Sequence, residues 1–170
     1  MRVVAYLRES TDPAEDRPAF AQQEDIRRYA AAHGLDVVAI CQDVPRPGLS
    51  LGRDGYRSLL NVLASGNVEA VLLPGLATLS ADVVLQEVIL WDLRARGARV
   101  VSTDAADADA LSLASDDATR RFVRDILSRV AEYRESLGLI APPAGPGPGT
   151  GGDGVVVHLV PAGDGDEPEA

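Results

Sequence analysis

The chain has 170 residues, and its 16 positive charges, all from arginine, stand against 26 acidic residues for a formal net charge of -10. This balance argues against a dedicated nucleic-acid module, because neutralising phosphates normally takes a surplus of basic residues, but it leaves room for a local basic cleft. A single cysteine excludes an intramolecular disulfide framework, and no apolar run approaches the ~18 residues of a membrane span. We therefore expect a soluble cytoplasmic protein without membrane contact.

The first elements alternate between strand and helix. Residues 2–7 form a short, β-branched apolar run typical of a buried strand, and residues 37–41 repeat that profile. Between them, residues 18–33 predict a helix that Gly34 ends. The apolar residues expected on its core face are Phe20, Ile26, Tyr29 and Ala30. A loop rich in Pro and Gly follows the second strand, over residues 43–52.

The alternation continues to the end of the patterned region. The remaining predicted elements are a helix over 53–65, a strand over 70–73, a helix over 80–96 with Ser80 as N-cap, a strand at 100–101, an Asp- and Ala-rich loop, and a long helix over 115–136. The long helix carries an apolar stripe made of Phe122, Ile126, Val130 and Tyr133.

Strands separated by helices imply right-handed crossovers and a mostly parallel sheet. The expected fold is therefore α/β, with three layers, helices flanking the sheet and a long C-terminal helix. In such sheets ligands bind beyond the carboxyl ends of the strands. Here those ends lead into residues 8–10, the loop that starts at Asp43, and residues 74–78.

The composition changes abruptly near Ile140. Residues 141–170 hold 8 of the 16 glycines and 6 of the 11 prolines, together with five acidic residues and no arginine. Such a segment buries too little apolar surface to offset its ordering entropy. We expect one domain over residues 1–138 and a disordered acidic tail over 139–170. Within the tail, residues 155–160 (VVVHLV) are the alternative: a strand that adds to an exposed sheet edge.

Ser10 and Arg8 are the first candidates for chemistry, because they follow a buried strand directly. A serine hydroxyl is a weak nucleophile unless a base or a cluster of cations activates it. The pair alone also fits a hydrogen-bonded loop serine beside a solvated arginine. Cys41 lies in an apolar strand and is expected to be buried and inert. No metal-ligand spacing and no phosphate-binding glycine loop is present, so neither a metal nor a cofactor is predicted.

The order of these residues resembles the serine recombinases, the resolvase and invertase family, over residues 2 to about 137. Tyr6, Arg8 and Ser10 match the family's YxRxS motif. The resemblance implies a resolvase-like fold with Ser10 as the nucleophile. In the family this serine attacks a DNA phosphodiester, forms a 5′-phosphoserine link and frees a 3′-hydroxyl, while arginines neutralise the transition state. Strand exchange then follows by subunit rotation within a tetramer.

Further matches extend into the next two elements. Gln23 matches the glutamine of the family's first helix, ahead of an apolar-Tyr-Ala segment. Asp43, Gly48 and Arg53 match the family's D-x3-SG-x4-RP stretch, so Arg53 falls on an active-site arginine.

The chain departs from the family after the third strand, where the family carries D-R-L-x-R. Leu79 keeps the leucine, but Ala77, Thr78 and Ala81 replace the aspartate and both arginines. Each lost phosphate donor typically accounts for ~10²–10³ in rate, and such losses are not additive. The tail also shows neither a helix-turn-helix pattern nor a basic residue. We therefore expect a degenerate member without the usual C-terminal DNA-binding module.

The long helix offers two further interpretations. Arg120, Arg121 and Arg124 are candidates for contact with a DNA backbone, although a solvated face paired with neighbouring aspartates also explains them. In the family this helix forms the dimer interface, so the resemblance implies a homodimer or higher oligomer through residues 115–137.

Two functions follow from these observations. The first is a serine-recombinase-like protein of DNA recombination, with activity at Ser10 impaired or lost and with DNA as a weak or indirect partner. The second is a non-catalytic dimerising module that modulates a recombinase or another partner. The first predicts that Ser10, Arg8 and Arg53 converge, whereas the second predicts tolerance of Ser10→Ala.

Overall fold

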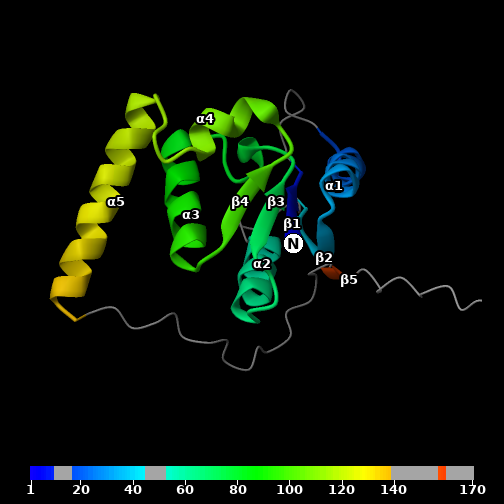
Figure 1. Cartoon of the computed structure of the whole chain (residues 1–170), viewed down its shortest axis with the longest axis horizontal. Helices are drawn as coiled ribbons and strands as arrows, with labels where there is room; N and C mark the ends of the chain where they lie inside the picture. The colour runs from blue at the N-terminus through cyan, green and yellow to red at the C-terminus, as the bar shows by residue number, and fades with distance from the viewer. Residues whose placement is uncertain (10–16, 45–52, 139–156, 160–170) are drawn as a thin grey trace, which may run out of the picture.

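The computed structural model describes residues 1–9, 17–44, 53–138 and 157–159, and its centre is a five-stranded sheet. The strands are β1 (Arg2–Arg8), β2 (Asp36–Asp43), β3 (Ala70–Leu73), β4 (Arg99–Ser102) and β5 (Val157–Leu159). Their order is β4-β3-β1-β2-β5, in which the first four run parallel and β5 pairs antiparallel with β2 (Figure 1). The mostly parallel sheet agrees with the sequence prediction.

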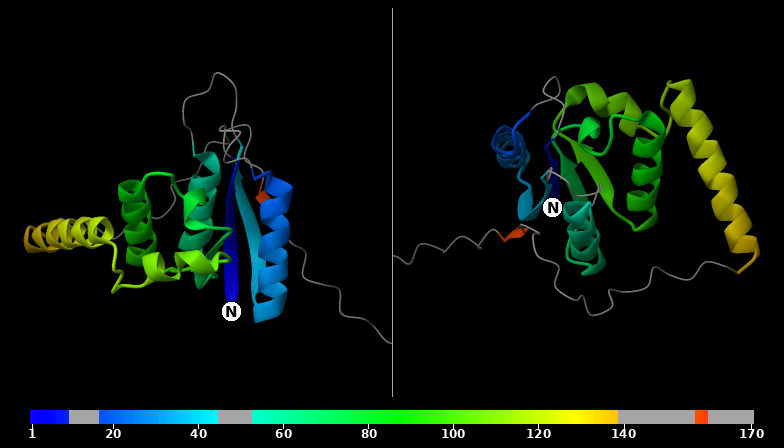
Figure 2. Two further views of the ribbon diagram at one scale, coloured as in Figure 1. Left: turned by 90° about the horizontal axis from the view of Figure 1, so that it is seen from above. Right: turned by 180° about the vertical axis from the view of Figure 1, so that it is seen from behind.

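Helices cover both faces of the sheet, which gives the expected three layers (Figure 2). The α-helices are α1 (Ala19–His33), α2 (Asp54–Ala64), α3 (Val83–Ala95), α4 (Ala108–Leu111) and α5 (Ala118–Ser136), and the 3₁₀ turns are η2 (Leu76–Thr78) and η3 (Ala105–Asp107). Figure 2 shows α1 on one face, α2 and α3 on the other, and α5 outside α3.

The core consists of two apolar clusters, one on each face of the sheet. Strand β1 is buried from Val3 to Leu7. Its residues alternate between the two clusters, as the pleat of a strand requires. Val4 and Tyr6 join the cluster beneath α2 and α3, whereas Val3, Ala5 and Leu7 join the cluster beneath α1. A continuous apolar run of this kind is typical of a strand with both faces covered.

Helix α1 ends where the sequence predicts, but one of the residues predicted for its buried face is exposed. Gly34 adopts φ +61° and its N–H bonds to the carbonyl of Ala30, which closes the helix. Ile26 and Ala30 are buried, whereas Phe20 is 74% exposed. Phe20 lies in the first turn of α1, six residues before Ile26, and that spacing places it away from the buried face.

Two other boundaries differ from the sequence prediction for local reasons. Helix α3 begins after Asp82, whose carboxylate accepts the N–H of Leu85, so Asp82 rather than Ser80 is the N-cap. Ser80 instead accepts the N–H of Asp82. The expected Asp- and Ala-rich loop contains η3 and α4, and Asp104 starts η3 by accepting the N–H of Ala106.

The tail contributes a strand where the sequence analysis favoured disorder. Backbone pairing joins Val157, His158 and Leu159 to Cys41, Ile40 and Ala39. Residues 157–159 thus pair as the edge-strand alternative describes, and the rest of the predicted tail lies outside the described residues. Among the helices that the structure describes, none has the length and hydropathy that crossing a membrane requires.

Candidate active site

The carboxyl ends of β1 and β2 meet at Asp43, which joins three elements. The Tyr6 hydroxyl of β1 donates to Asp43 Oδ2 over 2.6 Å. Asp43 Oδ1 accepts the backbone N–H of Gly55, in the first turn of α2, also over 2.6 Å. Arg8 and Asp43 are register partners in the parallel β1–β2 pair. One carboxylate thus holds the start of α2 against the carboxyl edge of the sheet.

Gly55 permits this contact because α2 approaches β2 very closely. A Cβ atom built on Gly55 would lie 2.4 Å from both the carbonyl carbon and the carbonyl oxygen of Gln42. These are backbone atoms, so the clash has no flexible side chain to relieve it. The position accepts only glycine without moving α2, and the approach is a feature that the sequence pattern alone does not reveal.

Arg8 and Arg53 lie at the same edge of the sheet. Burial raises the pKa of Tyr6 far above its ordinary value, assisted by the hydrogen bond to Asp43 and by the charge of Asp43. The positive charges of Arg53 and Arg8 act in the opposite direction on the same hydroxyl. Arg8 is the register partner of Asp43, and Arg53 is the N-cap residue of α2, two residues before the Gly55 N–H that Asp43 accepts. The backbone therefore brings these two predicted residues to the same edge of the sheet.

Gln22, the neighbour of the predicted Gln23, supports Arg8 from α1. Its Nε2 donates to the carbonyl oxygens of Arg8 and Arg17 over 2.9 and 2.6 Å, and its Oε1 accepts the N–H of Arg8 over 3.3 Å. Gln22 is buried, whereas Gln23 is only partly buried. Helical spacing could have identified Gln22, because it lies four residues before the buried Ile26 and on the same face.

Glu9 is the last described residue before the predicted nucleophile. Its N–H donates to the carbonyl of Asp43, and its carboxylate accepts the N–H of Ala19 at the start of α1. Ser10 and the predicted motif residue Gly48 lie outside the described residues. Their convergence with Arg8 and Arg53 stays a prediction.

The segment after β3 contributes no charged side chain at the positions where the family has three. Leu76 and Leu79 are buried and fix η2 to the core, and the N–H of Leu76 donates to Asp107 Oδ2 over 2.8 Å. Between and after them, Ala77 and Ala81 are exposed and Thr78 is partly buried. Their backbone positions are therefore well defined, but their side chains bring no cation to a phosphate.

Two of the three arginines predicted on the long helix are engaged inside the domain. Arg120 Nη1 lies 2.7 Å from Glu87 Oε1, and Arg124 Nε lies 2.6 Å from Glu87 Oε2. Glu87, on α3, is 1% exposed. Arg124 also donates to the carbonyl oxygens of Ala110 and Ser112.

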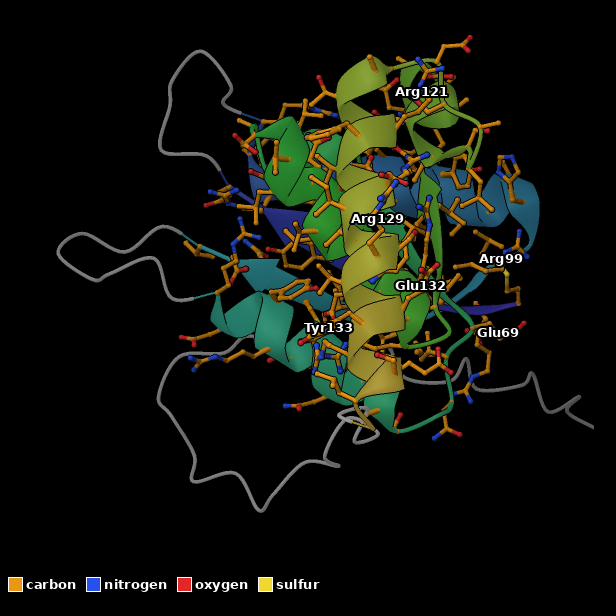
Figure 3. All side chains as sticks on the ribbon, turned by 90° about the vertical axis from the view of Figure 1, so that its left-hand side faces the viewer. Glu69, Arg99, Arg121, Arg129, Glu132 and Tyr133 are labelled. Atoms are coloured by element: carbon orange, nitrogen blue, oxygen red, sulfur yellow. The ribbon has the colours of Figure 1, made fainter. Side chains whose placement is uncertain are left out.

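These contacts tie α5 to α3 and α4, and they leave Arg121 as the exposed member of the three. In Figure 3 Arg121 lies near the start of α5, with Arg129, Glu132 and Tyr133 farther along the helix. The charge partner Glu87 lies 33 residues before Arg120, so a scan for local charge pairs does not find it.

Comparison with known proteins connects this geometry to a family. The model of the resolvase N-terminal domain matches residues 3–138. The N-terminal catalytic domain of TP901-1 integrase is 23% identical, with a TM-score of 0.54 over 81% of this chain and 98% of that chain. A resolvase family site-specific recombinase from Streptococcus pneumoniae is 20% identical, with a TM-score of 0.57 over 82% of this chain and 96% of that chain.

A third solved structure of similar fold is the C-terminal catalytic domain of ISC1926 TnpA, an IS607-like serine recombinase. It is 22% identical, with a TM-score of 0.51 over 84% of this chain and 89% of that chain. At these identities the solved structures establish the likeness of fold, and no curated protein matches the chain. The family model spans the described domain from β1 to the end of α5, and the chain therefore belongs to the resolvase family of serine recombinases.

Proposed function

We propose that this chain acts in DNA recombination as a serine-recombinase-type domain whose strand cleavage at Ser10 is strongly impaired. The observation that carries the proposal is the contrast between two strand ends. At the ends of β1 and β2, Asp43 connects Tyr6 with Gly55, and Arg8 and Arg53 lie two residues from Tyr6 and from Gly55 in the chain. The segment after β3 has lost every charged group of the family motif.

The chemistry requires more positive charge than the described site holds. Attack of the Ser10 oxygen on a DNA phosphorus forms a phosphoserine ester and breaks the bond from phosphorus to the 3′ oxygen, and the departing 3′ oxygen takes up the serine proton to become the 3′-hydroxyl. The transition state concentrates negative charge on the non-bridging oxygens, and preorganised donors must offset it. In this proposal Arg8 and Arg53 supply two guanidinium groups, whereas Thr78 and Ala81 supply none. Binding of a phosphate is therefore expected to outlast cleavage.

A second function is favoured by the outer face of α5. Helix α5 is anchored to α3 on one side through Val123 and the Arg120–Glu87 and Arg124–Glu87 ion pairs. Its apolar stripe points away from the domain. The four stripe residues Phe122, Ile126, Val130 and Tyr133 are all exposed, as is Leu137 at the C-cap of α5. Exposed apolar patches of this kind mark association surfaces. A module that dimerises through α5 and modulates a recombinase partner uses this face without any chemistry at Ser10.

The test of the first function is DNA binding as a function of salt. Binding of sheared genomic DNA is measured for the wild-type chain, Ser10→Ala and Arg8→Ala/Arg53→Ala, with Arg129→Ala as the matched control, because Arg129 is exposed on α5. If the two site arginines contact phosphates, their loss weakens binding and lowers the salt slope by about 2, since each phosphate contact contributes about 0.9. Ser10→Ala leaves binding unchanged. Equal slopes in the wild type and the double-arginine variant, or no binding at low salt, would contradict the proposal.

The test of the second function is self-association measured on the same proteins. A dimer that persists in Arg8→Ala/Arg53→Ala but is lost on polar substitution in α5 supports the interaction module. Dimerisation that depends on DNA would instead attribute assembly to the first function.

A further inference from the structure

None of the strands β1, β3 and β4 pairs with the outer edge of β2. Strand β2 has eight residues and pairs along its inner edge with β1 from Asp36 to Asp43. Its outer edge lies at the end of the sheet, where backbone N–H and C=O groups would be free to pair with any extended chain. Such an edge promotes association between molecules unless something covers it.

A three-residue strand occupies this edge in the structure. Val157, His158 and Leu159 pair antiparallel with Cys41, Ile40 and Ala39, opposite the middle of β2 (Figure 1). The sequence agrees with the placement, because residues 155–160 (VVVHLV) are rich in β-branched residues while the flanking tail is rich in Gly and Pro. The strand-forming segment of the tail therefore includes the residues that pair with the outer edge of β2.

We propose that the outer edge of β2 is a strand-docking surface whose occupant is this chain's own segment Val157–Leu159, and that this segment keeps the sheet from pairing edge to edge with a second copy. The proposal rests on the β2–β5 backbone pairing alone. It does not depend on Ser10, on the arginines or on the α5 stripe, so it is tested separately from the proposed function.

The size of β5 determines how firmly it docks. Three residues form few backbone hydrogen bonds, each with a net contribution of about 0.5–1.5 kcal/mol, so an isolated peptide of this length would bind very weakly. Attachment to the same chain replaces that weak encounter with an effective concentration in the millimolar range. The docked strand is consequently reversible, and it covers three of the eight residues of β2.

The test is residue-resolved amide hydrogen exchange along β2 in the full-length chain. Successive N–H groups of a strand point to opposite edges, so Val157→Pro/His158→Pro removes at least one donor that faces β2, whichever register of donors holds. The matched control, Val157→Thr/His158→Thr, keeps both N–H groups and places strand-forming residues at both positions. We expect the outward-facing amides among Ala39, Ile40 and Cys41 to exchange at least about tenfold faster in the proline variant and to stay protected in the threonine variant.

Three further measurements make the outcome decisive. Amides of β1 and β3 report on global folding and stay protected in the proline variant if only the edge has opened. A synthetic peptide covering residues 153–165, added at millimolar concentration to the proline variant, restores protection of the β2 amides. The proline variant also sediments as a larger species at high protein concentration, and the peptide reverses this. Unchanged exchange in the proline variant, or fast exchange of the outer β2 amides in the wild-type chain, would overturn the proposal.

Discussion

At the residue scale, a single glycine sets how closely helix α2 approaches the sheet. The N–H of Gly55 reaches Asp43, and Asp43 in turn accepts the Tyr6 hydroxyl, so the approach organises the whole edge around Arg8 and Arg53. Only glycine allows this close backbone contact, because any other residue adds a Cβ atom that would clash with the Gln42 backbone.

Gly55→Ala is predicted to destabilise the domain and to loosen this edge. The added Cβ would meet the Gln42 backbone at 2.4 Å, so α2 must move, at a cost of about 1–3 kcal/mol or more. Gly75→Ala is the matched control, because its Cβ would find its nearest neighbour at 3.7 Å. Urea unfolding measures both. Equal free energies of unfolding for the two variants would show that the close approach does not exist.

Glu87→Gln is predicted to destabilise the domain by about 3–5 kcal/mol. Glu87 is 1% exposed and balances two arginine side chains that are themselves about 10% exposed, so its neutralisation leaves buried positive charge without a partner. Glu132→Gln, on the exposed face of α5, serves as control and is expected to change the unfolding free energy by less than ~0.5 kcal/mol. A Glu87→Gln variant as stable as the control would mean that α5 is not anchored through this carboxylate.

The buried thiol of Cys41 predicts a loss of stability at alkaline pH. Burial, with a smaller effect of the Asp43 charge, raises the pKa of Cys41 from 9.0 to about 12. The folded chain therefore holds the thiol proton more tightly than the unfolded chain. Its contribution is fully present below pH 9 and is lost as pH rises from 9 toward 12.

Between pH 8 and pH 10 this amounts to about 1.4 kcal/mol in the free energy of unfolding. The measurement is urea unfolding at pH 8, 9 and 10 for the wild type and Cys41→Ala. The variant is less stable at pH 8, because it loses buried side-chain volume, but its free energy of unfolding falls less steeply with pH. Parallel pH profiles for the two proteins would contradict the raised pKa.

Single residues also show what a sequence can and cannot predict. Arg8 was a candidate because it directly follows a buried strand, whereas Arg53 was a candidate only through its match to the family motif. Glu87 was not, because its role depends on two arginines more than 30 residues away that packing alone brings together. The motif match pointed to Gln23, whereas the residue that hydrogen-bonds to the Arg8 backbone is its neighbour Gln22.

At the element scale, helix α5 combines an anchored face with an apolar face that the domain does not cover. Val123 is buried on the anchored side, whereas Phe122 and Tyr133 are both 65% exposed. Periodicity correctly predicted the helix and its stripe, but it does not distinguish a stripe that packs inside the domain from one that faces outward.

Phe122→Glu/Tyr133→Glu is therefore predicted to weaken self-association without reducing thermal stability. Both side chains are 65% exposed, so the substitutions remove little intramolecular burial. Val123→Ala gives the reverse pattern, with a lower Tm and the association intact. Sedimentation velocity and thermal unfolding measure the two effects. A double variant that associates as strongly as the wild type would exclude α5 as the interface.

At the scale of the whole molecule, the sequence predicts most of the architecture but not the strand pairing of the tail. The alternation of apolar runs and helices predicts the parallel sheet, because each strand from β1 to β4 has its own local signal. Strand β5 has such a signal too, but its partner β2 lies more than 100 residues earlier, and no local pattern specifies that pairing. Long-range pairing of this kind follows from which sheet edge stays uncovered.

The central claim for the molecule is that the missing charges after β3, and not the rest of the site, limit strand cleavage. It is tested most directly by restoring them as Ala77→Asp/Thr78→Arg/Ala81→Arg and looking for covalent protein–DNA adducts on a denaturing gel. We predict a Ser10-dependent adduct in the restored chain, abolished by Ser10→Ala in the same background, and at least ~10²-fold less adduct in the wild type. An equal yield from the wild-type and restored chains, or an adduct that survives Ser10→Ala, would contradict the account.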